Sequence, residues 1–220
     1  MGTAAGAVFG GAVTHRRTAA AAHMVAAACA LLLSPPAALA QHRSQPVELP
    51  PPDPAALAAG FDGTLLACES WVLDPTSWSG AQGIAPLVEL SGLGGRIAPV
   101  PSVVDAALPP QEWRVANHYF RIDATRGEGF FLVVSDRVPM CHITGGGIND
   151  MRAVVEQVLA SPQFAHRWEQ VDETTREDMV STVYRHRLAP QMELVVSRKP
   201  AGDPTDLVQV IASAQYRVGE

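Results

Sequence analysis

Residues 118–147 read HYFRIDATRGEGFFLVVSDRVPMCHITGGG, and this stretch decides the predicted fold. From His118 to Asp123, side chains that suit a core alternate with polar ones, which is typical of a strand with one buried face. Phe130 to Val134 is continuously apolar, as in a strand that is buried on both faces. Met140 to Ile143 predicts a third, short strand, and the glycine run at 145–147 is expected to end it. Short turns between neighbouring strands favour an antiparallel sheet.

Two helices are predicted directly after these strands. Asn149 or Asp150 is expected to cap the first helix, whose apolar residues recur at the spacing of one helical face. Ser161 and Pro162 begin the second helix as its N-cap and its first residue. The residues expected on the apolar side of this second helix are Phe164, Trp168 and Val171.

Three more strands are predicted to close the chain, over residues 179–186, 192–198 and 207–218. The order β-β-β-α-α-β-β-β indicates an α+β domain, with an antiparallel sheet of about five or six strands and helices packed on one face. The other face of the last strands carries mostly polar side chains, so we expect it to face solvent. A partner or a ligand bound on that face is the alternative interpretation.

A helix is predicted to precede the sheet. Asp53 suits its N-cap and Pro54 its first position, and the helix is expected to end near Asp74. Its apolar residues recur at steps of three or four and so form one stripe: Leu57, Phe61, Leu65, Cys68 and Val72. Residues 53–220 are therefore predicted to form a single domain, in which an N-terminal helix and an irregular segment (53–112) precede the sheet and its helices (113–220).

The first 40 residues have the organisation of a cleaved secretory signal peptide. An arginine pair at 16–17 is their only charge, and an apolar run follows that is strongest from Met24 to Leu33. Helix breakers and an A-x-A site come next, at 34–40, so we expect cleavage between Ala40 and Gln41. The apolar run is too short to span a bilayer, which takes roughly 20 residues. An uncleaved N-terminal anchor is the alternative.

The arginine pair leaves two export routes open: the general secretory pathway, which we expect, and the twin-arginine pathway. Heavy use of alanine and a single lysine, Lys199, indicate a GC-rich bacterial genome, so the expected destination is the periplasm or the outside of a bacterium. Residues 41–52 are rich in proline and are interpreted as a flexible spacer before the folded part. No stable membrane span is expected after cleavage.

Cleavage would leave Cys68 and Cys141 as the only cysteines. An even count in an oxidising compartment predicts a structural disulfide between them. Two buried free thiols are the competing structural interpretation. A catalytic Cys141 beside His142 is disfavoured, because neighbours on a strand point to opposite faces of the sheet.

A second candidate site combines histidines with the glycine run. His118 and His142 are predicted on strands that could bring them together, and Gly145, Gly146 and Gly147 lie where backbone N–H groups at a helix start could bind an anion. The glycines match neither the dinucleotide-binding nor the phosphate-loop motif, and the histidines form no zinc motif. We therefore predict no cofactor and no metal, and we assign no catalytic residue.

Composition limits the function further. With 47% hydrophobic and 17% charged residues, the chain cannot be disordered as a whole. The net charge is −6, and loss of the two arginines with the signal peptide moves it to −8, which argues against a nucleic-acid partner. The leading hypothesis is an exported, non-enzymatic envelope protein that binds an envelope protein or a small ligand, or supports envelope assembly. The alternatives are an exported hydrolase with catalytic residues assembled from distant positions, and an inhibitor of an envelope enzyme.

Overall fold

A computed structural model describes residues 51, 53–74, 85, 88–89, 92, 94–176, 179–199 and 208–216 of the chain. The predicted signal peptide lies outside the described residues, as does the predicted spacer except for Pro51. Residues Gln45–Glu220 form one compact unit.

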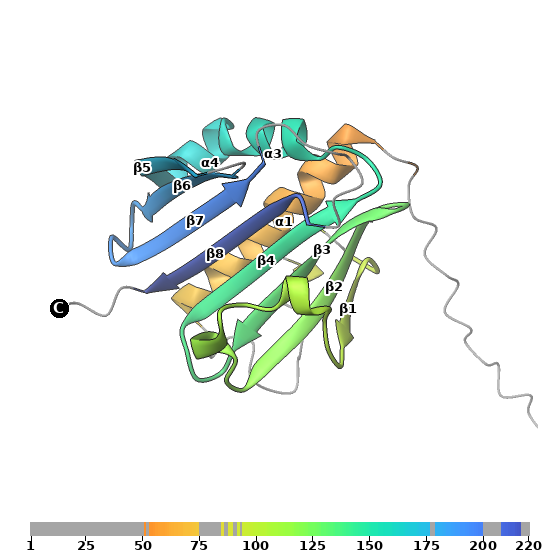
Figure 1. The fold of residues 1–220 in the computed structure, drawn as a ribbon, viewed down its shortest axis with the longest axis horizontal. Helices are drawn as coiled ribbons and strands as arrows, with labels where there is room; N and C mark the ends of the chain where they lie inside the picture. Colours follow the sequence, from red (N-terminus) through yellow and green to blue (C-terminus); the bar gives the residue numbers. More distant parts are fainter. Residues whose placement is uncertain are drawn as a thin grey trace, which may run out of the picture. The chain divides into compact units, whose positions relative to one another are not determined.

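A single antiparallel sheet of eight strands, in the order β1-β2-β3-β4-β8-β7-β6-β5, forms the centre of this unit (Figure 1). The strands are β1 (Ile97–Val100), β2 (Asn117–Thr125), β3 (Glu128–Ser135), β4 (Met140–Gly147), β5 (Trp168–Arg176), β6 (Met179–His186), β7 (Met192–Arg198) and β8 (Val210–Tyr216). Each half of the sheet is a four-stranded meander, and the halves join where β4 pairs with β8. The predicted α+β class and the antiparallel pairing are confirmed.

The predicted number of about five or six strands is wrong, because both edge strands lack the hydrophobic pattern of the others. β1 is only four residues long and contains Pro99, a residue that sheets tolerate at an edge. β5 is exposed at every residue except Trp168. The predicted second helix corresponds to α4 (Pro162–Arg167), which ends before Trp168. The helical spacing of Phe164, Trp168 and Val171 therefore spans the end of a helix and the start of a strand.

The glycine run does not end β4, as the sequence suggested it would. Residues 145–147 continue the strand and pair with residues 128–130 of β3. A side chain at Gly145 would lie 2.6 Å from the ring of Phe130 and 2.7 Å from the side chain of Val210. Glycine is required at this position because the side chains of neighbouring strands pack closely over it, and not because the chain turns.

Helix α1 (Pro54–Leu73) covers one face of the sheet, where it packs against β2, β3, β4 and β8 (Figure 1). The Asp53 carboxylate accepts a hydrogen bond from the N–H of Ala55 (3.2 Å) and caps the helix. Cys68 of α1 and Cys141 of β4 form a disulfide with their Cα atoms 5.5 Å apart, so the predicted pairing is confirmed. By length and composition α1 could also cross a membrane, but here its apolar residues pack in the core.

Helix α3 (Arg152–Leu159) packs against α1 and α4. Its N-cap is Met151, whereas the sequence predicted Asn149 or Asp150. Asp150 still contributes, because its carboxylate accepts a hydrogen bond from the N–H of Arg152 (3.0 Å). Met151 makes no side-chain cap bond; its side chain is fully buried, and its N–H donates to the Gln209 side chain beside β8 (2.9 Å).

An ion-pair cluster ties α1 to the second meander. Arg167 at the end of α4 donates to Asp62 (3.1 Å) and to Glu69, both on α1, and its side chain is only 17% exposed. His186 of β6 lies 3.1 Å from Glu69 through its Nε2, and its Nδ1 accepts a hydrogen bond from the N–H of Ala189. Both ring nitrogens of His186 are therefore used in structural contacts.

Candidate functional site

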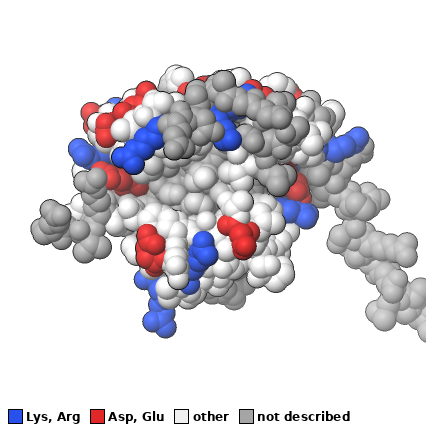
Figure 2. Space-filling model, in the orientation of Figure 1, with Lys and Arg blue, Asp and Glu red and all other residues white. Residues whose placement is uncertain are grey.

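The candidate site lies on the open face, which we define as the sheet face opposite α1. A connecting segment, residues 101–116 with the short 3-10 helices Asp105–Ala107 and Gln111–Trp113, passes in front of β2, β3 and β4 on this face (Figure 1). Figure 2 views the same face, and its visible centre lacks Lys, Arg, Asp and Glu among the described residues, with charged residues around it. The visible centre of the open face is therefore uncharged, and the connecting segment covers the part of the face over β2, β3 and β4.

A cavity of about 430 Å³, the open-face pocket, lies between this segment and the sheet. Three parts of the chain line it: the segment itself, strands β2 to β4 with the turn between β2 and β3, and Val208 just before β8. The lining residues used below are Val104, Ala106, Ala107, Arg121, Asp123, Thr125, Glu128, Gly129, Phe131, Thr144, Gly146 and Val208. The surface that these residues present to the pocket is mostly apolar, and the volume falls in the usual range of small-molecule sites.

Glycines form part of the pocket wall. Gly129 of β3 and Gly146 of β4 are cross-strand partners, and both line the pocket. Both positions present only backbone to the pocket, and a side chain at Gly129 would lie 2.3 Å from the carbonyl oxygen of Ile122. The glycine run was thus a sequence signal of the site, although the sequence interpretation assigned it to a strand-to-helix turn.

Thr144 is a buried polar residue of the pocket wall. It is 2% exposed, and its Oγ1 has no hydrogen-bond partner in the described part of the chain. A buried hydroxyl without a partner costs about 1–3 kcal/mol relative to a satisfied one. The other threonine of the lining, Thr125, donates its hydroxyl to Glu128. Thr144 is therefore the threonine of this wall with unused hydrogen-bonding capacity.

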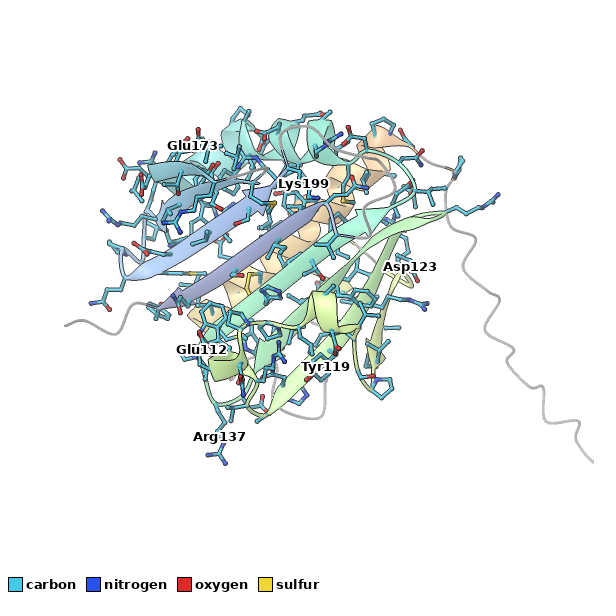
Figure 3. The ribbon with its side chains drawn as sticks, viewed as in Figure 1. Glu112, Tyr119, Asp123, Arg137, Glu173 and Lys199 are labelled. Atoms are coloured by element: carbon cyan, nitrogen blue, oxygen red, sulfur yellow. A yellow bond between two sulfur atoms is a disulfide. The ribbon has the colours of Figure 1, made fainter. Side chains whose placement is uncertain are left out.

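Two charged residues at the pocket neutralise each other. Arg121 donates from its guanidinium to the carboxylate of Asp123 (3.0 Å), and the two side chains are 54% and 32% exposed. Both belong to β2, and Figure 3 shows Asp123 toward the edge of the open face. This ion pair leaves no net charge at this side of the pocket.

The third charged residue of the lining, Glu128, directs its side chain to the other face. Position 147 of β4 faces the α1 side of the sheet, and a Cβ atom added to Gly147 would lie 2.7 Å from the Glu128 Cγ. The carboxylate accepts hydrogen bonds from Thr125 and Asn149. Glu128 therefore satisfies its charge through these groups.

His142 and Ser213 form a hydrogen-bonded pair on the open face. The His142 Nδ1 lies 2.8 Å from the Ser213 Oγ, on neighbouring strands β4 and β8. Burial lowers the pKa of His142 to about 4, so the imidazole is neutral and weakly basic at pH 7. Its Nε2 is buried and finds no hydrogen-bond partner within the described residues. A serine nucleophile needs a base near the working pH that a third group orients, and this pair lacks both features.

The structure does not bring the two candidate histidines together. β3 lies between the strands of His118 and His142, and the register places them on opposite faces of the sheet. His118 pairs instead with Asp136 (2.7 Å), and both of these side chains are half exposed. The glycine run is paired along its whole length, so it does not form the turn at a helix start that an anion site would need.

Other catalytic or metal-binding groupings are not found in the described ranges. No group of three His, Cys, Asp or Glu side chains there could hold a metal ion. Cys141, the sequence candidate for a nucleophile, is bonded to Cys68. The open-face pocket is therefore the candidate site that the described residues support. Comparison with protein-family models, curated proteins and solved structures finds no match to this chain.

Proposed function

We propose that this protein is an exported, non-enzymatic binding module of a bacterial envelope, and that it holds a small, largely apolar ligand in the open-face pocket. The observation that carries the proposal is the pocket itself, a cavity of about 430 Å³ with a mostly apolar lining. A cavity of this size and lining is the usual form of a small-molecule site. A hydrolase receives less support, because in the His142–Ser213 pair the histidine is a weak base, and among the described residues no acid orients it.

Export is proposed on two grounds. Residues 1–40 have the organisation of a signal peptide, and the Cys68–Cys141 disulfide suits an oxidising compartment such as the periplasm or the medium. Mass analysis of the protein from the envelope or the medium should find a chain that starts at Gln41. An intact Met1 in that fraction would reject the cleavage site.

The binding function is tested with N-phenyl-1-naphthylamine, an uncharged dye that fluoresces strongly in apolar surroundings. The purified wild-type protein should bind it saturably. Ala106→Trp fills the pocket from the connecting segment, at an exposed alanine where the fold is not at risk, and should weaken binding at least about tenfold. Ala153→Trp makes the same change at an exposed position of α3 away from the pocket and should leave binding unchanged.

Equal binding by the two tryptophan variants would place the dye elsewhere on the chain and reject the pocket as the ligand site. Because both variants share the rest of the chain with the wild type, any dye bound by other segments contributes equally to all three titrations.

A further inference from the structure

We infer that the ligand of the open-face pocket is an uncharged molecule with an apolar body and one hydrogen-bonding group, which Thr144 receives. The inference rests on the proposed function and narrows it to a chemical class. Three properties of the pocket wall carry it: its apolar side chains, its lack of a free charge and its single unused hydroxyl.

The apolar side chains come from opposite sides of the pocket. Val104 and Ala107 lie on the connecting segment, Phe131 lies on β3, and Val208 lies just before β8. A ligand between them removes apolar surface from water on both of its faces. Such burial favours binding in proportion to the apolar area, so the body of the ligand is expected to be apolar.

The charges at the pocket favour an uncharged ligand. Arg121 and Asp123 are already paired with each other, and Glu128 directs its carboxylate to the α1 side of the sheet. A charged ligand would lose its hydration in this pocket without gaining a free counter-charge, and such a transfer is unfavourable. An anion would also meet the Asp123 carboxylate beside the only arginine of the lining.

Thr144 selects for a single polar group on the ligand. Its Oγ1 is unused in the described residues, whereas the hydroxyl of Thr125 is engaged by Glu128. Threonine rotamers are separated by about 120°, so one step about the Cα–Cβ bond can bring the hydroxyl to the position that the methyl group occupies here. The hydroxyl can then donate to a carbonyl or ether oxygen, or accept from an N–H or O–H, of a ligand in the pocket.

A matched pair of dyes tests the charge. N-phenyl-1-naphthylamine and 8-anilinonaphthalene-1-sulfonate share one ring system and one N–H, and they differ by a sulfonate. We expect the wild-type protein to bind the uncharged dye at least about tenfold more tightly than the sulfonate.

Substitutions of Thr144 test the hydrogen bond. Thr144→Val keeps the shape of the side chain and removes the hydroxyl, so it should weaken binding of the uncharged dye about fivefold. Thr144→Ser keeps the hydroxyl and should bind within about twofold of the wild type. Thr174→Val, at an exposed position of β5, is the matched control and should bind as the wild type does.

The results separate this inference from the function on which it rests. If the sulfonate binds as tightly as the uncharged dye, the ligand class is wrong although the pocket still binds. If Thr144→Val binds as the wild type does, the assigned hydrogen bond is wrong. If the wild type binds neither dye more tightly than the Ala106→Trp variant binds it, the proposed binding function itself is rejected.

Discussion

Reduction of the Cys68–Cys141 disulfide is expected to lower the free energy of unfolding by about 4 kcal/mol. The bond spans a sequence separation of 73 residues, and the chain-entropy model gives roughly that loss at 25 °C for a loop of this length. Both cysteines belong to the core, with exposed fractions of 1% and 0%. Reduction leaves two packed thiols and no cavity, so the loss should report the covalent link between α1 and β4.

Urea unfolding followed by tryptophan fluorescence, with and without dithiothreitol, measures this loss. For a urea m-value of about 2 kcal/mol/M, the midpoint should fall by about 2 M on reduction. The double variant Cys68→Ala/Cys141→Ala is the control, because its midpoint should not respond to the reductant. If the oxidised and reduced proteins unfold at the same urea concentration, with the oxidation state of each verified by mass, the reasoning from loop closure is refuted.

Three further predictions concern buried groups, and urea or thermal unfolding measures each of them. Burial lowers the pKa of His142 from 6.5 to about 4, so the unfolded chain binds more protons between these values. Stability should therefore fall by up to about 3 kcal/mol as the pH drops from 7 to 4, and His142→Gln should lose this part of the pH dependence. Arg167→Ala should cost about 3 kcal/mol because it leaves two carboxylates of α1 without their cation, whereas Arg185→Ala, at an exposed arginine 4.0 Å from its partner, should cost less than about 1 kcal/mol. Gly145→Ala should cost about 1–3 kcal/mol because its methyl group would overlap a neighbouring ring, whereas Gly94→Ala, whose nearest neighbour is 4.0 Å away, should be nearly neutral.

Each prediction has an outcome that contradicts it. An unchanged pH profile in His142→Gln would mean that this imidazole does not cause the loss at low pH. Equal losses in the two arginine variants would remove the distinction between a mostly buried arginine with two carboxylate partners and an exposed arginine 4.0 Å from its partner. Equal losses of stability in Gly145→Ala and Gly94→Ala would show that close packing on β4 is not the reason for glycine at position 145.

Strands inside the sheet could be predicted because their apolar residues contrast with the polar, turn-forming residues beside them in the sequence. β6 and β7 have the predicted bounds, 179–186 and 192–198, since apolar residues alternate along β7 and the sequence between the two strands favours a turn. β5 has no such contrast, because all of its residues after Trp168 are exposed. Its pairing with β6 provides the backbone hydrogen bonds that make it a strand, and no local pattern encodes that pairing.

The pocket was beyond prediction for a related reason. It forms where residues 104–107 meet β2, β3 and β4, and the separation between that segment and the sheet follows from the whole fold. The glycines at 145–147 were the available local signal. A run of glycine is as typical of a turn as of strand positions that must lack a side chain. The pairing of Cys68 with Cys141 needed no such information, since cysteine count and compartment already indicated it.

The polarity of β5 has a consequence for how separate molecules of this protein behave at high concentration. An edge strand offers free backbone groups on which another chain can add a strand, and natural sheets block this with charges and proline. β5 carries Glu169, Asp172, Glu173 and Arg176 along one edge, and Pro99 interrupts the donors at the opposite edge. Edge-to-edge aggregation is thereby opposed at both edges of the sheet. The polar sequence of β5, which gives no hydrophobic pattern from which to predict a strand, also keeps neighbouring copies from extending the sheet.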